Sequence, residues 1–157
     1  MEKEKSYINI VIVSLDDKFS KNVANDLASN LDMFLADCKD LIEYDLIDPK
    51  EILNKCGFDY LKKREKCVVK NCAEYQNTVI TIKYDLLKEY YEVFKDSMII
   101  YLELSNMKVN QSINKIDYDN RNNFIKGIAD LTILLDKKSK VQAVKKIIEK
   151  LGEMVWI

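Results

Sequence analysis

The stretch that decides the fold is Ile8-Asn9-Ile10-Val11-Ile12-Val13, followed by Ser14-Leu15-Asp16-Asp17-Lys18-Phe19-Ser20-Lys21-Asn22. A β-branched run of this length, bounded by polar residues and followed by a helical pattern, predicts a buried parallel strand that leads into a helix. In nucleotide-binding α/β proteins, phosphate binds at this kind of junction. Here the junction contains no glycine and carries two carboxylates, Asp16 and Asp17.

Apolar runs and helical patterns alternate along the rest of the chain. Further strands are predicted at 33–36, 78–82, 98–104 and 131–135, with helices between and after them, including one over 85–94. Asp48-Pro49 predicts a helix start, and residues 106–126 are expected to be helical in part and mobile in part. This order predicts an α/β three-layer sandwich with a five-stranded parallel sheet. Since no repeat or Pro/Gly linker interrupts it, we expect residues 1–157 to form a single domain.

Charge and hydropathy exclude several classes of partner. Lys and Arg number 25 and Asp and Glu 26, so no general attraction to nucleic acid or to a membrane surface is expected. The longest apolar runs are too short to span a bilayer, and the start Met-Glu-Lys-Glu-Lys lacks the apolar segment of a signal peptide. The sequence therefore predicts a cytoplasmic protein.

Missing residue types restrict the chemistry further. The chain contains no histidine, so triads, imidazole acid–base catalysis and His-based metal sites are excluded. Its three glycines are scattered, so no glycine-rich phosphate cradle is present. The four cysteines show no paired metal-binding spacing, and we expect them to be reduced and packed as small apolar residues, with no metal bound.

A series of short segments resembles shikimate kinase, a small member of the P-loop nucleoside-monophosphate-kinase-like group. The resemblance covers nearly the whole length and implies that fold. It rests on Asn22-Val-Ala-Asn-Asp-Leu-Ala-Ser-Asn-Leu31, on Phe34 to Glu43, on Pro49-Lys-Glu-Ile-Leu53 with Gly57 and Leu61-Lys-Lys-Arg-Glu65, on Met98 to Ser105, and on Ile128-Ala129-Asp130.

The same resemblance implies a degenerate phosphate loop. The family's G-x-x-x-x-G-K-[ST] motif falls on residues 14–21, where Ser14 and Phe19 replace the glycines, Ser20 the lysine and Lys21 the magnesium-binding hydroxyl. The loop candidates are Ser14, Asp16, Asp17, Lys18, Ser20 and Lys21. Asp16 and Asp17 would repel a triphosphate. Ser14-Leu-Asp-Asp17 also predicts a helix N-cap with an acidic third position, so we expect the helix to be capped internally, without phosphate.

On the acceptor side, the resemblance implies a changed pocket. The first aspartate of the family's D-x-D is retained as Asp37 and the second becomes Lys39, while Lys62 replaces a substrate-binding arginine. The family's triple glycine falls on residues 83–85, beginning with Lys83, and the shortened lid segment has Arg121 as its only arginine. The pocket candidates are therefore Asp37, Lys39, Lys62 and Lys83.

These features favour a shikimate-kinase-like protein that has lost ATP binding and kinase activity and serves as a binding or regulatory module for an unidentified protein partner. Two alternatives stay open. One is a divergent small-molecule kinase that uses ATP and Mg²⁺, with Asp37 acting on an acceptor hydroxyl and Lys18, Lys21 and Lys62 holding anions. The other is a binder of a small polar metabolite without turnover. No cofactor and no catalytic residue are expected unless the divergent kinase is correct.

Overall fold

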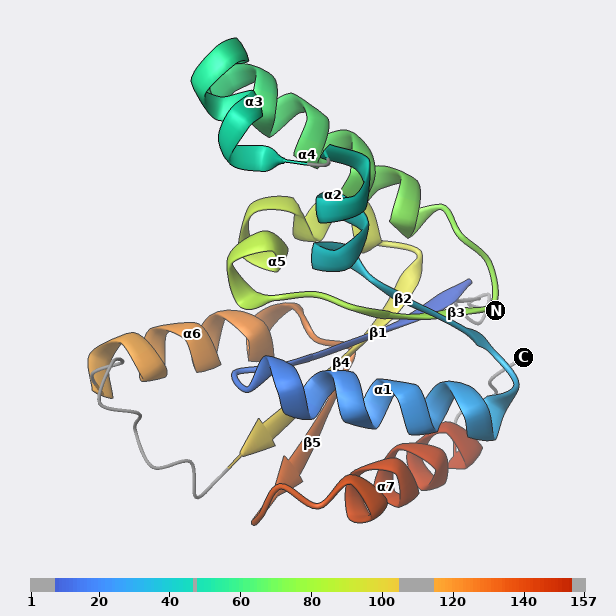
Figure 1. The fold of residues 1–157 in the computed structure, drawn as a ribbon. Coiled ribbons are helices and arrows are strands. Elements are labelled where there is room, and N and C mark those ends of the chain that lie inside the picture. The colour runs from blue at the N-terminus through green and yellow to red at the C-terminus, as the bar shows by residue number, and fades with distance from the viewer. Residues whose placement is uncertain (1–7, 47, 105–114, 154–157) are drawn as a thin grey trace, which may run out of the picture.

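The computed structural model describes residues 8–46, 48–104 and 115–153. A parallel sheet with the strand order β2-β3-β1-β4-β5 lies between helices on its two faces (Figure 1). The α/β sandwich with five parallel strands predicted from the sequence is confirmed. The elements are β1 (Asn9–Ser14), α1 (Asp17–Leu31), β2 (Phe34–Asp37), α2 (Cys38–Leu46), α3 (Pro49–Cys56), α4 (Phe58–Ala73), β3 (Thr78–Thr81), α5 (Tyr84–Tyr90), the 3₁₀ helix η1 (Tyr91–Phe94), β4 (Ser97–Leu104), α6 (Lys115–Ile128), β5 (Leu131–Leu135) and α7 (Lys140–Glu153).

The central strand is β1, the strand that the β-branched run predicts. It pairs with β3 on one side and β4 on the other, and all of its residues are buried. A strand covered on both faces needs apolar side chains in both directions, which explains why its apolar residues are continuous rather than alternating.

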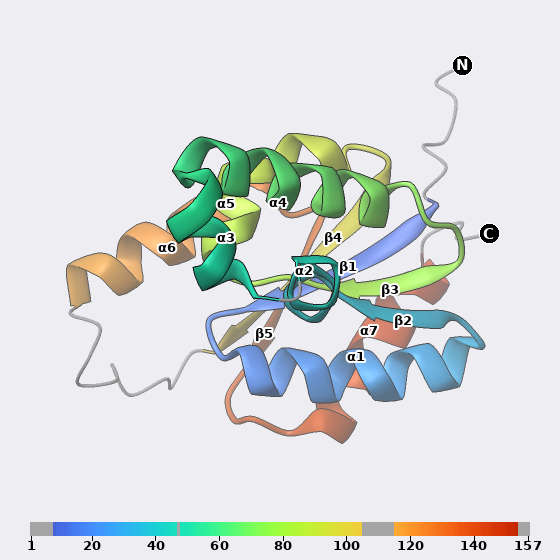
Figure 2. The same cartoon turned by 45° about the horizontal axis from the view of Figure 1, so that its top comes forward.

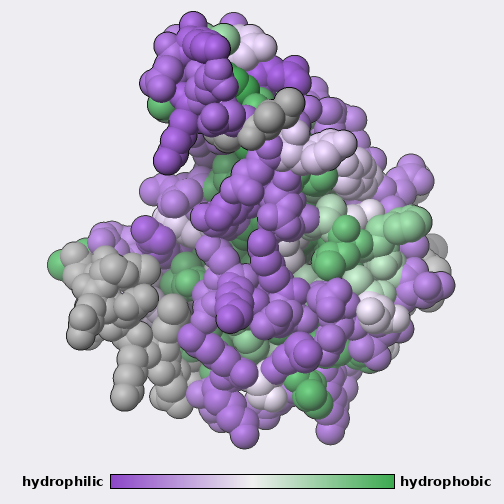
Figure 3. Space-filling model, viewed as in Figure 1, coloured by the Kyte–Doolittle hydropathy of each residue, from purple (hydrophilic) through white to green (hydrophobic). Residues whose placement is uncertain are grey.

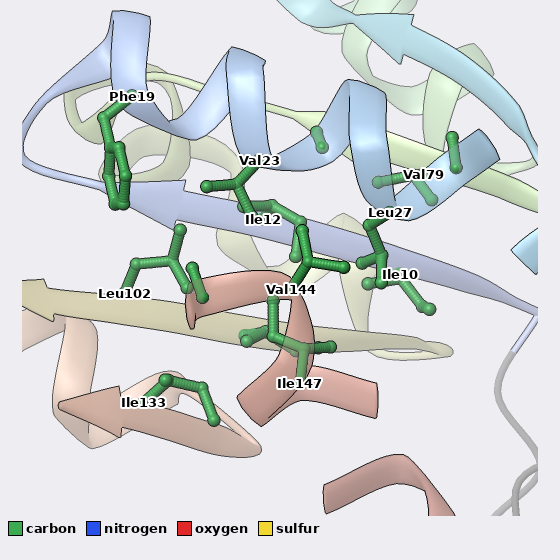
Figure 4. Packing of buried hydrophobic residues seen from close by; sticks show 14 of the residues in the cluster. Ile10, Ile12, Phe19, Val23, Leu27, Val79, Leu102, Ile133, Val144 and Ile147 are labelled. Atoms are coloured by element: carbon green, nitrogen blue, oxygen red, sulfur yellow. The ribbon is translucent and has the colours of Figure 1, made fainter. Parts of the chain in front are cut away.

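One face of the sheet is covered by α1 and α7. Phe19, Val23 and Leu27 of α1 lie at helical spacing and point toward Ile10 and Ile12 of β1 (Figure 4). From α7, Val144 and Ile147 pack into the same cluster beside Leu102 and Ile133 (Figure 4). The apolar stripes that predicted these two helices thus form the core on this side.

The opposite face is covered by α2, α4, α5 and α6, as the turned view makes clear (Figure 2). Their buried side chains pack against Val11 and Val13 of β1, which point away from the first cluster. Alternate residues of β1 therefore serve two separate hydrophobic layers.

Some boundaries differ from the sequence prediction. The helix expected over 85–94 is instead α5 followed by η1, and Tyr90, the last residue of α5, has a non-helical backbone conformation (φ −123°, ψ 16°). Of the segment 106–126, the part from Lys115 belongs to α6, while residues 106–114 lie outside the described residues. At α3 the predicted cap is present, because the Asp48 carboxylate accepts hydrogen bonds from the N–H groups of Lys50 and Glu51.

At one edge of the sheet lies the short strand β2. Phe34 is 71% exposed and Leu35 47% exposed. Hydrophobic residues on this face of the molecule gather over that edge (Figure 3).

Within the described residues, no helix combines the length and apolar character needed to cross a membrane.

Candidate functional site

A pocket of about 320 Å³ lies where β1, β2 and β3 end. The helix that follows β1 covers one face of the sheet and the helix that follows β3 covers the other, so the connections that leave these two adjacent strands diverge there. In open α/β sheets, ligands bind in the crevice at such a point. The surface over these strand ends is hydrophilic (Figure 3). The residues that line the pocket are Asp17, Lys18, Ser20, Lys21, Asp37, Lys39, Thr81, Ile82 and Lys83.

The connection from β1 to α1 consists of Leu15 and Asp16 alone. Asp16 is the N-cap: its Oδ1 accepts a hydrogen bond from the Phe19 N–H at 3.1 Å. The prediction that Ser14 caps the helix, with Asp17 at the third helical position, is wrong, because Asp17 is the first helical residue and makes no capping hydrogen bond. The buried Ser14 hydroxyl instead accepts from the Asp16 N–H and shares a 2.6 Å hydrogen bond with the Ser20 hydroxyl.

The Asp16 carboxylate also has a charged partner. Lys138, in the connection between β5 and α7, places its Nζ 2.6 Å from Asp16 Oδ2. Burial by itself would raise the pKa of Asp16, but the Lys138 ammonium and the Phe19 N–H outweigh it and lower that pKa. A carboxylate and an ammonium of the chain therefore occupy the amino end of α1.

Asp37, at the end of β2, is held from three directions. The Thr81 hydroxyl donates to its Oδ1 at 2.6 Å, the Asp40 N–H donates to its Oδ2 at 3.1 Å, and Lys21 Nζ lies 3.3 Å from Oδ2. Lys21 also lies 3.6 Å from Asp40 Oδ1. Although burial opposes it, this pair of carboxylates raises the pKa of Lys21 and keeps the ammonium charged.

The pocket carries two more positive than negative side chains. Lys21 is neutralised by aspartates, whereas Lys18 forms no ion pair with any described residue, and Lys39 has only Glu43 at 3.9 Å. Lys83 precedes α5 and acts on Asp17, whose pKa is raised by burial despite the lysine's opposing charge. The arrangement suits a ligand that brings negative charge.

Three of the four pocket candidates lie together and one does not. Asp37, Lys39 and Lys83 line the pocket, but Lys62 on α4 is bonded to Glu65 at 3.2 Å and Glu89 at 3.1 Å. Burial opposes charge on Lys62, but these two carboxylates raise its pKa.

The only arginine of the shortened lid segment, Arg121, lies on α6. Its guanidinium carbon is 4.8 Å from the centre of the Tyr84 ring, so the side chain stacks on α5.

Two contributing residues were missed by the sequence analysis. Thr81 could have been found, because the parallel register places it opposite Asp37. For Lys138, nothing in its local sequence signals the contact with Asp16.

The cysteines in the described residues are all free, but Cys56 and Cys67 are exposed, so the expectation that all four pack as small apolar residues is wrong for these two. Cys38 and Cys72 are buried with their Sγ atoms 3.8 Å apart, and their mutual hydrogen bond and burial raise the pKa of the Cys38 thiol well above its usual range. No group of three or more His, Cys, Asp or Glu side chains in the described ranges is placed to hold a metal ion.

Comparison by sequence finds no match to a family model or to a curated protein. Comparison of structures finds kinases. Shikimate kinase from Aquifex aeolicus superposes with a TM-score of 0.68 at 16% identity, over 92% of this chain and 96% of that one. Shikimate kinase from Acinetobacter baumannii, in complex with shikimate, gives 0.68 at 17% identity, over 95% of each chain. A sugar kinase from Janibacter sp. gives 0.56 at 13% identity, over 93% and 95%.

At these identities the likeness establishes the fold alone. The chain has the fold of shikimate kinases and related kinases, as the sequence resemblance implied.

Proposed function

We propose that this chain binds a small organic anion in the pocket at the ends of β1, β2 and β3 and does not transfer phosphate from ATP. The observation that carries the proposal is the Asp16–Lys138 pair at the amino end of α1. In a kinase of this fold, that helix end must be free to receive phosphate.

The repulsion between Asp16 and a triphosphate supports the loss of ATP binding. Two like charges about 4 Å apart repel by roughly 4 kcal/mol at an effective dielectric constant of about 20. Without compensation, that amount would weaken binding by about three powers of ten, and the Lys138 ammonium beside Asp16 offsets part of it. Because Asp16 accepts the Phe19 N–H, the triphosphate would also have to displace an existing capping bond.

The lysines support retention of a binding role. One pocket is lined by three lysines: Lys18 from α1, Lys39 from α2 and Lys83 from the residue before α5. Without a ligand, these positive charges repel one another. A carboxylate or phosphate on a small metabolite would relieve that repulsion. A lysine ammonium group binds such anions as a point charge.

A divergent kinase remains the second candidate because of Asp37. Its carboxylate lies beside the pocket and is oriented by Thr81, as a group that accepts a proton from a substrate hydroxyl would need to be. In that case ATP would bind through Lys18 and Lys83 rather than through backbone N–H groups.

Thermal unfolding with candidate ligands separates the two functions. We expect shikimate or a similar small acid to raise the melting temperature, because a ligand at about a hundred times Kd stabilises the native state by roughly 2.7 kcal/mol. Mg-ATP is expected to cause no shift. The Lys83→Gln variant should lose the response to the acid, while Lys145→Gln, at an exposed position of α7, should keep it.

A phosphate-transfer assay directly tests the proposal that the chain does not transfer phosphate from ATP. Purified protein is incubated with γ-labelled ATP, Mg²⁺ and a panel of small hydroxy acids, and labelled product is sought. We expect none above the level of a no-protein control. Product formation that is lost in Asp37→Asn would establish the divergent kinase instead.

A further inference from the structure

The pocket at the ends of β1, β2 and β3 is lined by charged groups of both signs that lack a close partner. Lys18 and Lys83 form no ion pair with any described residue, and Lys39 has only Glu43 at 3.9 Å. The Asp17 carboxylate lines the same pocket and likewise forms no hydrogen bond or ion pair with a described residue. A ligand that completes all of these contacts needs both negative and positive groups.

The other polar side chains of the pocket are already engaged within the protein. Asp37 pairs with Lys21 at 3.3 Å, and the Thr81 hydroxyl donates to Asp37 at 2.6 Å. The Ser20 hydroxyl shares a 2.6 Å hydrogen bond with the Ser14 hydroxyl. The groups without partners therefore decide which ligand the pocket selects, because only they gain a contact without losing one.

The surroundings of Asp17 favour an ammonium over a hydroxyl. Burial raises the pKa of Asp17, the Lys83 ammonium opposes that rise, and the carboxylates of Asp16, Asp37 and Asp85 add to it. Asp16 and Asp37 have lysine partners of their own, whereas Asp85 forms no ion pair within the described chain. An ammonium placed against Asp17 gains Coulomb energy from each nearby carboxylate, while a hydroxyl gains one hydrogen bond.

The three lysines suit more than one carboxylate. Lys18 belongs to α1, Lys39 belongs to α2 and Lys83 precedes α5, so the ammonium groups reach the pocket from separate elements. Each acts as a point charge toward an anion. The volume of about 320 Å³ lies at the small end of the range for small-molecule sites, which fits a molecule of the size of an amino acid.

We propose that the organic anion bound in this pocket is an acidic amino acid, with its two carboxylates on Lys18, Lys39 and Lys83 and its ammonium on Asp17. The inference rests on the proposed function, since it specifies the ligand of the same pocket.

Methyl NMR of the full chain with labelled isoleucine tests the ligand class. Ile82 lines the pocket and reports binding, whereas Ile147, buried between α7 and the other face of the sheet, is the reference signal. Glutamate, 2-hydroxyglutarate and glutarate differ only in an ammonium, a hydroxyl or a hydrogen at one carbon, and aspartate, malate and succinate form the same series one carbon shorter. In at least one series we expect the amino acid to saturate the Ile82 shift with a Kd about fivefold below those of the other two, the factor for one favourable exposed charge pair.

The variant Asp17→Asn should abolish this preference. The affinity for the amino acid should fall by about fivefold, while the affinity for the plain diacid should not fall, because only the ammonium loses its partner. Asp96→Asn is the matched control, since Asp96 is exposed and precedes β4 at the opposite end of the sheet. An unchanged Ile147 signal confirms that each variant is folded.

Three results would overturn the inference: a hydroxy acid or plain diacid that binds as tightly as the amino acid in both series, a preference that persists in Asp17→Asn, or no saturable Ile82 shift with any of the six compounds. In the first two cases the pocket still binds organic anions, so the proposed function stands. In the third case shikimate decides: a saturable Ile82 shift with shikimate retains the proposed function, and no shift rejects it as well.

Discussion

Asp16 is one residue whose carboxylate does two things at the start of α1: it satisfies a backbone N–H and it pairs with Lys138. Asp17, next along the chain, has the same side chain but accepts no capping hydrogen bond from a backbone N–H of α1. The two residues therefore form a matched pair for measuring what a cap contributes.

We expect Asp16→Ala to lower the free energy of unfolding by about 1–2 kcal/mol, the usual range for removal of an N-cap. Asp17→Ala should change it by much less, because Asp17 gives up no capping bond. Urea denaturation followed by circular dichroism measures both. A larger loss in Asp17→Ala than in Asp16→Ala would contradict the assignment of the cap.

The lowered pKa of Asp16 predicts a pH dependence. A carboxyl whose pKa is lower in the folded than in the unfolded protein stabilises the fold above the unfolded value, here 3.8, and loses that effect as the pH falls through the folded value. We therefore expect the stability advantage of the unaltered protein over Asp16→Asn to be constant near neutral pH and to shrink below about pH 4. Urea midpoints at a series of pH values measure this difference.

At the scale of elements, the register of β2 and β3 fixes the position of Asp37. The pairing places Asp37 opposite Thr81, and the threonine hydroxyl donates to the carboxylate at 2.6 Å. Two strands far apart in sequence thus hold one polar group at the edge of the pocket.

We expect Thr81→Val to lower the free energy of unfolding by about 1.5–3 kcal/mol, because a hydrogen bond to a charged group is lost without a change in shape. Thr132→Val, on β5, is the control, since the Thr132 hydroxyl bonds to no described residue. Urea denaturation compares the two variants. Equal effects would mean that the Asp37 contact does not stabilise the sheet.

Sequence reasoning was most successful where a whole element repeats one pattern. The apolar runs placed all five strands to within two residues at each end, and the stripe of Phe19, Val23 and Leu27 placed α1. The start of α1 was misplaced because Ser14 and Asp16 are both good caps, and only the three-dimensional turn decides between them.

Apart from Thr81 opposite Asp37, side-chain pairs between distant elements were out of reach of the sequence. Lys62 was assigned to the pocket from a position in the family resemblance, but Glu65 and Glu89 hold it on α4. Lys138 was not considered, since its contact with Asp16 depends on how the connection before α7 packs. Sequence patterns predict which face of a helix or strand is buried, whereas these contacts depend on side-chain rotamers.

For the whole molecule, the two hydrophobic layers share β1. Ile10 and Ile12 belong to one layer and Val11 and Val13 to the other. Loss of this strand would disrupt both layers together, so the proposal that the chain is a single domain has a direct consequence for unfolding.

We expect one cooperative thermal transition, with coincident curves from far-UV circular dichroism and from the near-UV signal of the tyrosines, among which Tyr101 is fully buried. Calorimetric and van't Hoff enthalpies should agree. Two separated transitions would show that the layers unfold independently and would contradict the single domain.

The short strand β2 ends the sheet with exposed Phe34 and Leu35, and no other strand of the described residues lies beside this edge. Such an edge can template intermolecular pairing, and natural proteins often protect it with lysine. A single added charge at this edge should therefore reduce aggregation. We expect Leu35→Lys to delay the onset of light scattering during slow heating, and we expect Val141→Lys, at an exposed position of α7, to cause no delay. This sheet edge would then set the concentration at which the protein begins to precipitate.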